Sequence, residues 1–70
     1  MNKELVDIIQ SVVGNKELVI TEETEIIDDL ELSSLEFFDL ITRVENHFNI
    51  KVSDRELQEL ETVGDIVRLL

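Results

Sequence analysis

Two adjacent serines, Ser33 and Ser34, are the residues of this chain best placed to do chemistry. Glu36 follows Ser33 by three residues, which is the spacing of a capping box and predicts that a helix begins at Ser34. A hydroxyl at the first helical position lies at the positive end of the helix dipole. Free backbone N–H groups there would stabilise a phosphate ester on Ser34. From the residues alone, Ser34 can equally be no more than the first residue of a helix.

Classical enzyme chemistry is excluded by spacing. The only histidine, His47, lies thirteen residues beyond Ser34 on the same predicted helix, about 20 Å away at a rise of about 1.5 Å per residue. A Ser–His dyad therefore fails, and we predict no catalytic residues. A calcium loop beginning at Asp29 would lack the turn glycine at its sixth position and the acidic residue at its twelfth, which is Leu40. We therefore predict no dedicated metal site.

The length and composition indicate one domain over residues 1–70. The chain has no cysteine, so any thioester chemistry would need a sulfur atom from a prosthetic group. No apolar run approaches a membrane span, and the first residues lack the pattern of a signal peptide. We therefore expect a soluble, cytoplasmic protein.

The charge is strongly one-sided, with 17 acidic against 6 basic residues and a net charge of −11. Between Lys16 and Arg43 there is no lysine or arginine, whereas acidic residues recur throughout. Such a field repels nucleic acid and anionic membranes and steers basic protein surfaces toward the acidic region. For any single carboxylate, the alternative is a solvated residue that serves only solubility.

Apolar residues at helical spacing predict a first helix over residues 3–13, capped by Asn2 and stopped by Gly14. A second helix is predicted over residues 34–48. The long segment between them has no sustained period, but its scattered apolar residues favour an ordered loop pinned to the core. These residues are Leu18, Ile20, Ile26, Ile27, Leu30 and Leu32.

Two further capping boxes predict the remaining helices. Ser53 with Glu56 begins a short helix that carries Leu57 and Leu60. Thr62 with Asp65 begins the last helix, with apolar residues Val63, Ile66, Val67, Leu69 and Leu70. The expected fold class is all-α, a small bundle of three long helices plus one short helix.

The second helix is predicted to have two unlike faces. Its apolar face comprises Phe37, Phe38, Leu40, Ile41, Val44 and Phe48, which we expect to pack in the core. Leu35 lies on the opposite side, with Glu36, Asp39, Thr42, Arg43 and Asn46. We expect Leu35, Glu36, Asp39 and Thr42 to be the residues that partner proteins contact.

The order of these features along nearly the whole chain resembles the acyl carrier protein family. Members carry Asp-Leu-Gly-x-Asp-Ser-Leu before a helix that ends in Phe, then Ile-x-Ile, and a last helix opened by Thr-Val. The matching segments here are Asp29–Leu35, Phe48, Ile50–Val52 and Thr62–Val63. Two departures from the pattern matter: Glu31 replaces the usual Gly, and Ser33 replaces the usual Asp.

The resemblance implies that Ser34 carries 4′-phosphopantetheine, added from coenzyme A by a phosphopantetheinyl transferase. It implies a four-helix, monomeric carrier that holds acyl intermediates as thioesters in fatty-acid, polyketide or related biosynthesis. Its partners would be acyl-transferring and chain-extending enzymes with basic surfaces. The alternative is an unmodified acidic module that binds a basic protein by charge complementarity.

Overall fold

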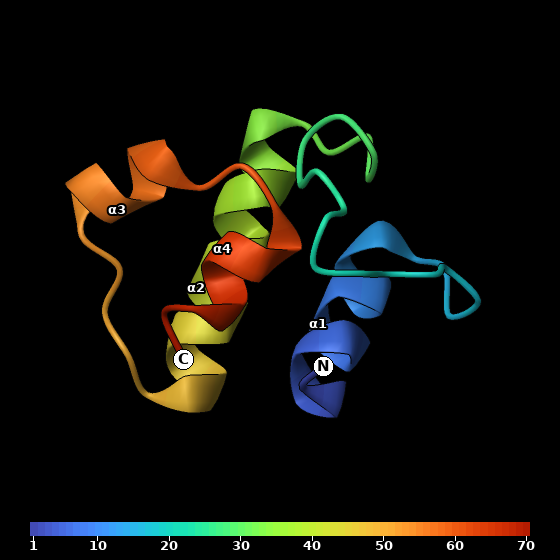
Figure 1. Cartoon of the computed structure of the whole chain (residues 1–70), viewed down its shortest axis with the longest axis horizontal. Helices are drawn as coiled ribbons and strands as arrows, with labels where there is room; N and C mark the ends of the chain where they lie inside the picture. Colours follow the sequence, from blue (N-terminus) through green and yellow to red (C-terminus); the bar gives the residue numbers. More distant parts are fainter.

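The computed structural model describes all of residues 1–70 as four helices joined by loops, within 30 × 21 × 20 Å (Figure 1). The helices are α1 (Lys3–Val13), α2 (Ser34–Phe48), α3 (Asp54–Glu59) and α4 (Val63–Val67). The all-α class and the predicted bounds of the first two helices are confirmed. The expectation of three long helices is wrong, because only α1 and α2 are long.

The ends of the long helices follow from their capping residues. The Asn2 side chain accepts hydrogen bonds from the backbone N–H groups of Glu4 and Leu5 and so begins α1. Gly14 ends α1 in the left-handed conformation, at φ 80°. Asn49 ends α2 in the same way at φ 55°, a conformation that asparagine tolerates better than most residues.

The last helix is shorter than its apolar pattern suggested. Thr62 and Asp65 form the predicted capping box. After Val67, however, the backbone N–H groups of Leu69 and Leu70 donate to carbonyls only three residues earlier, which is the tighter pattern of a 3₁₀ turn. The helix therefore stops before Leu70, and the side chain of this residue remains 43% exposed.

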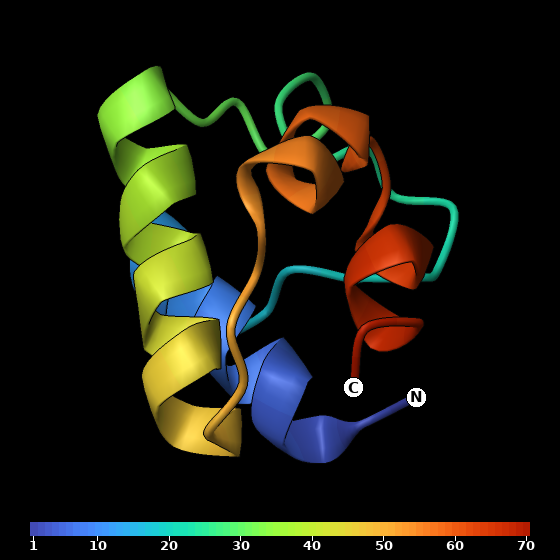
Figure 2. The same ribbon diagram turned by 90° about the vertical axis from the view of Figure 1, so that its left-hand side faces the viewer.

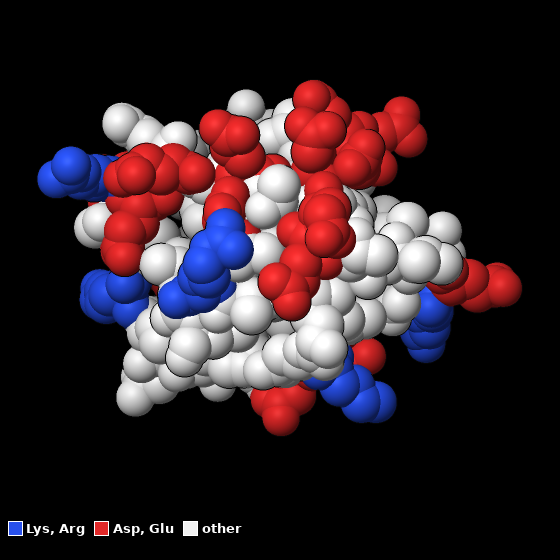
Figure 3. All heavy atoms as spheres, viewed as in Figure 1, with Lys and Arg blue, Asp and Glu red and all other residues white.

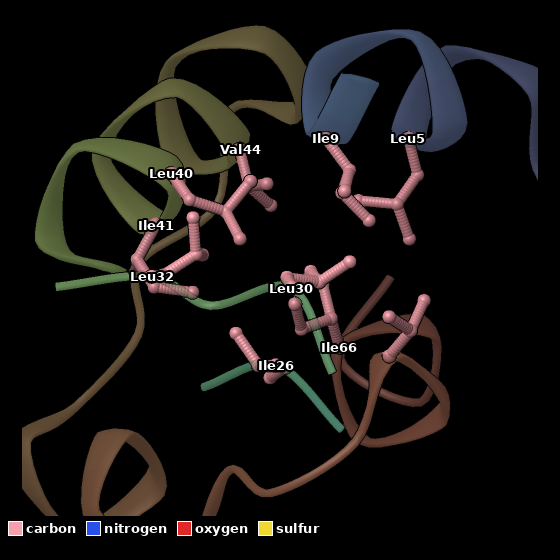
Figure 4. Packing of buried hydrophobic residues seen from close by; sticks show 10 residues of the cluster. Leu5, Ile9, Ile26, Leu30, Leu32, Leu40, Ile41, Val44 and Ile66 are labelled. Carbon is pink, nitrogen blue, oxygen red and sulfur yellow. The ribbon is translucent and has the colours of Figure 1, made fainter. Parts of the chain in front are cut away.

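The core draws on α1, α2, α4 and the long loop, whose apolar side chains point toward one another (Figure 4). Its ten buried residues are Leu5, Ile9, Ile26, Leu30, Leu32, Leu40, Ile41, Val44, Val63 and Ile66. α3 contributes no buried residue. Figure 2 shows the segment after α2 running back along that helix to reach α3.

Two residues predicted to be in the core are instead exposed. Phe38 is 50% exposed, because at about 100° per residue it lies at the edge of the apolar arc of α2. Ile27 is 45% exposed, because its neighbour Ile26 takes the buried position in the loop. The prediction of an ordered loop is confirmed by the burial of Ile26, Leu30 and Leu32.

Backbone hydrogen bonds fasten the long loop to the segment between α3 and α4. The N–H groups of Ile26 and Val63 donate to the carbonyls of Glu61 and Thr24, each at 2.9 Å. The Gly64 N–H donates to the Glu22 carbonyl at 2.8 Å, and a Cβ on Gly64 would lie 2.9 Å from that oxygen. Glycine therefore permits the close approach that holds the loop leading to Ser33.

Candidate functional site

The capping box at the start of α2 has both of its hydrogen bonds. The Glu36 N–H donates to Ser33 Oγ at 3.2 Å, and the Ser33 N–H donates to Glu36 Oε1 at 2.9 Å. The backbone N–H of Ser33, and then its side chain, hold the pKa of Glu36 below its ordinary value of 4.5. Glu36 is therefore a carboxylate at neutral pH, and the hydroxyl of Ser33 is already used by the cap.

Ser34 differs from Ser33 in that its hydroxyl is free. It is the first residue of α2, its side chain is exposed, and Oγ makes no hydrogen bond to the protein. The backbone N–H groups of Ser34 and Leu35 have no acceptor in the protein either, as expected in the first turn of a helix. A phosphate ester on Oγ would meet two free donors and the positive end of a 15-residue helix. The residues present therefore fit a phosphate-linked group.

The turn before the cap has an unusual backbone at Glu31, whose φ is +52°. Its neighbours Leu30 and Leu32 are only 5% and 6% exposed, so both leucine side chains enter the core while Glu31 lies outside. Residues with a Cβ rarely adopt this left-handed conformation, and glycine adopts it freely. This conformation explains why the acyl carrier protein pattern has Gly at this position. With Glu31 in its place, the backbone is strained.

The structure exposes all four residues predicted to meet partners: Leu35, Glu36, Asp39 and Thr42. Leu35 is 83% exposed, as its position opposite the apolar face predicted. Phe38 lies three residues beyond Leu35 and adds a second exposed apolar side chain. Its ring packs edge-on against that of Phe37, with the ring centroids 5.7 Å apart. The sequence did not predict that Phe38 is exposed beside Leu35, because its position on the helix favoured the core.

Two polar links between α1 and α2 were not predicted. Arg43 Nε lies 3.2 Å from Asp39 Oδ1, and Arg43 Nη1 lies 3.4 Å from Ser11 Oγ on α1. His47 Nε2 lies 2.5 Å from Glu4 Oε2. Ser11 and Arg43 are separated by 32 positions in the sequence, and Glu4 and His47 by 43. They meet because α1 packs against α2. A single sequence offers no signal for such pairs, since each residue is an ordinary member of an exposed helix face.

Acidic side chains gather at the end of the molecule where α2 begins, whereas much of the opposite end is uncharged on this face (Figure 3). Asp29 is partly committed within the loop, because its Oδ2 accepts the Glu25 N–H at 2.8 Å. Ser34 thus stands in a negative field.

None of the helices has the length and apolar character needed to span a bilayer.

Comparison with known proteins shows the family of this chain. The family model described as a phosphopantetheine attachment site matches residues 3–70. An acyl carrier protein of Thermotoga maritima is 45% identical over 60 residues, which are 86% of this chain and 74% of that protein. An acyl carrier protein of Coprothermobacter proteolyticus is 38% identical over 68 residues, 97% of this chain and 83% of that protein.

A solved structure has the same fold. The holo acyl carrier protein of Geobacter metallireducens superposes with a TM-score of 0.86 at 36% identity, over 94% of this chain and 76% of that one. The matching family model and the shared fold define the class of this chain as a phosphopantetheine-binding carrier protein. The chain belongs to the acyl carrier protein family. The predictions of a covalent 4′-phosphopantetheine cofactor and of a carrier rather than an enzyme are confirmed at the level of this family.

Proposed function

We propose that Ser34 is the residue to which 4′-phosphopantetheine is attached, and that residues 1–70 act as one carrier domain. The observation that carries this proposal is the contrast between two neighbouring hydroxyls. Ser33 Oγ accepts the Glu36 N–H and supports the helix, whereas Ser34 Oγ is exposed and unengaged beside two free amides. Modification of Ser34 leaves the cap in place.

The arm would supply the thiol that the protein lacks, since the chain contains no cysteine. Acyl intermediates would then be carried as thioesters, with the reactive chemistry belonging to the cofactor and recognition belonging to the protein. We propose a monomeric carrier serving fatty-acid, polyketide or related biosynthesis. The strong acidity favours acyl cargo. The cytoplasmic location stays a prediction.

Partners on this proposal are a phosphopantetheinyl transferase and acyl-transferring or chain-extending enzymes with basic surfaces. A net charge of −11 favours fast, salt-sensitive association with such enzymes. Leu35, Glu36, Asp39 and Thr42 would form the contact surface around the arm. Leu35 would supply the apolar contact, and the carboxylates would meet lysine or arginine side chains.

The same acidic surface supports the alternative of an unmodified module that binds a basic protein. Mass spectrometry of the protein purified from its native host separates the two functions. A carrier is recovered partly or wholly with one phosphopantetheinyl group, and peptide mapping places the group on the peptide containing Ser34. Recovery of only the unmodified mass, under conditions where another carrier of the same host is modified, contradicts the carrier function.

A further inference from the structure

The exposed face of α2 carries two carboxylates with different surroundings. Glu36, in the first turn, accepts a backbone N–H and has no cation beside it. Asp39, less than one turn further along, is paired with Arg43 at 3.2 Å. Both side chains of that pair are about half exposed, at 49% for Asp39 and 48% for Arg43. The two acids therefore present different charges to an approaching protein.

The position of Arg43 is unusual in this chain. It is the only lysine or arginine between Lys16 and Lys51. Its guanidinium is directed by two groups, the Asp39 carboxylate and the Ser11 hydroxyl on the neighbouring helix. The link to α1 keeps the guanidinium beside Asp39 instead of extending toward solvent.

An exposed ion pair of this kind contributes little to stability. Its effect on a partner is different, because two opposite charges about 3 Å apart act as a neutral unit at distances near the Debye length of about 8 Å. On this exposed face of α2 the unpaired negative charge is then that of Glu36, and it continues into the acidic loop rather than along the face. His47, one turn beyond Arg43, is likewise placed against a carboxylate, that of Glu4 on α1.

We propose that Arg43 is a specificity-determining residue that screens Asp39 and confines docking of basic partners to the first turn of α2 and the loop before it. This inference rests on the proposed function of Ser34 as a carrier site. The partner that fits has a compact basic patch facing the loop and Glu36, with no requirement for a basic group opposite Asp39. An enzyme whose basic patch extends along the whole helix is disfavoured.

The screening itself can be measured without any cofactor. Octalysine is titrated at low ionic strength into ¹⁵N-labelled protein while amide chemical shifts are followed. In the unsubstituted protein, shifts are expected in the loop and first turn of α2 and not around Asp39. In Arg43→Gln they extend to Asp39 and Thr42, with the Kd falling about threefold. Adding Asp39→Asn to Arg43→Gln should restore the original map.

Arg55→Gln is the matched control, because Arg55 is also paired with a carboxylate four residues away, Glu59 at 3.6 Å on α3. It changes the net charge by the same amount but lies on α3 and not beside Asp39, so it should leave the map of α2 unchanged. Equal perturbation of Asp39 and Glu36 in the unsubstituted protein overturns the proposal. So does an Arg43→Gln variant whose map and Kd do not change.

The second arm follows modification, with coenzyme A, by a phosphopantetheinyl transferase chosen for a basic patch long enough to face both Glu36 and Asp39. Arg43→Gln should raise kcat/KM about threefold at low salt, through KM, and the gain should disappear at high salt. An unmodified parent protein contradicts the proposed function, and the octalysine arm still decides whether Arg43 screens Asp39. A modified parent with no gain, or a loss, in Arg43→Gln overturns the role of Arg43 in selecting partners.

Discussion

The starts of α2 and α3 use the same capping box. In α2 the two bonds between Ser33 and Glu36 are 2.9 and 3.2 Å, and in α3 those between Ser53 and Glu56 are 3.0 and 3.1 Å. Both glutamates have pKa values below the ordinary value, chiefly because of the backbone N–H of the capping serine. The two helices therefore begin with nearly the same geometry.

The residues after the two caps are different. The first helical residue is Ser34 in α2 and Asp54 in α3, and the second is Leu35 in α2 and Arg55 in α3. α2 has 15 residues, three of them buried, whereas α3 has six and buries none. A capping box thus supplies a helix start but not a site. The candidate site needs in addition a free hydroxyl, an exposed apolar neighbour and a helix anchored in the core.

The largest expected effect comes from moving the motif. In a Ser34→Ala background, Asp54→Ser with Arg55→Leu recreates Ser-Ser-Leu-Glu at the start of α3. We expect phosphopantetheinylation at least about a hundredfold slower than in the unsubstituted protein, a loss of about 2.7 kcal/mol in transition-state binding, since the loop and the long helix are absent there. Intact-mass kinetics with coenzyme A and the transferase measure it. Rapid modification of the transplanted motif would show that the tetrapeptide alone suffices.

Leu35 provides the next largest difference between the two helix starts. Leu35→Ala should lower transfer to cognate enzymes about five- to tenfold, because part of a leucine contact worth about 1.5–3 kcal/mol is lost. Leu35→Arg, which copies α3, should be at least as damaging. Thermal unfolding should hardly change in either variant, since the side chain is 83% exposed. A large drop in stability would mean that Leu35 packs in the fold rather than against partners.

Replacing either capping serine by alanine should loosen the helix that it caps, but the two replacements should differ in their effect on the stability of the whole protein. Ser33→Ala should lower the free energy of unfolding by about 1 kcal/mol, because α2 is anchored in the core. Ser53→Ala removes the same bond from a helix with no buried residue, so it should mainly loosen α3. Urea unfolding and amide hydrogen exchange separate the outcomes. Equal global losses would indicate that α3 is as much part of the cooperative core as α2.

The smallest effects are expected on the stability of the protein at acidic pH. Glu36, Glu56 and Asp65 all have lowered pKa values in the folded protein, that of Asp65 being about 2 against an ordinary 3.8. A depressed folded pKa stabilises the protein above the unfolded value, and this contribution is lost as the pH falls through the folded one. Asp65→Asn should therefore flatten the stability curve between about pH 4 and pH 2.

Glu36→Gln and Glu56→Gln are the milder counterparts, because glutamine can still accept the N–H of the capping serine. Each should flatten the stability curve below the ordinary glutamate pKa of 4.5. Equilibrium unfolding across this pH range checks both. Curves parallel to that of the unsubstituted protein would show that these carboxylates are not coupled to folding.

Helix starts were predictable from the sequence, because a capping box is local and its residues lie three apart. Asn2, Ser33, Ser53 and Thr62 all cap as expected. The face of a helix was less predictable at its margins. Phe38 lies at the edge of an apolar arc, and whether an edge residue is covered depends on neighbouring elements that the helical period does not describe.

The features that could not be predicted depend on tertiary structure. The pairing of Glu4 with His47, and of Ser11 with Arg43, requires α1 and α2 to lie side by side. The positive φ of Glu31 occurs between two leucines that both enter the core. At the candidate site, the sequence indicated which serine caps and which is free, and the structure adds how the surrounding charges are paired.

The most direct test of the central claim is the site of modification in two single variants. Ser33→Ala and Ser34→Ala are incubated with coenzyme A and a broad-specificity transferase and then weighed by intact mass spectrometry, with circular dichroism as the check on folding. Ser34→Ala should fold normally and gain no mass, whereas Ser33→Ala should gain one phosphopantetheinyl group. A folded Ser34→Ala variant that still gains the group would contradict the assignment of Ser34.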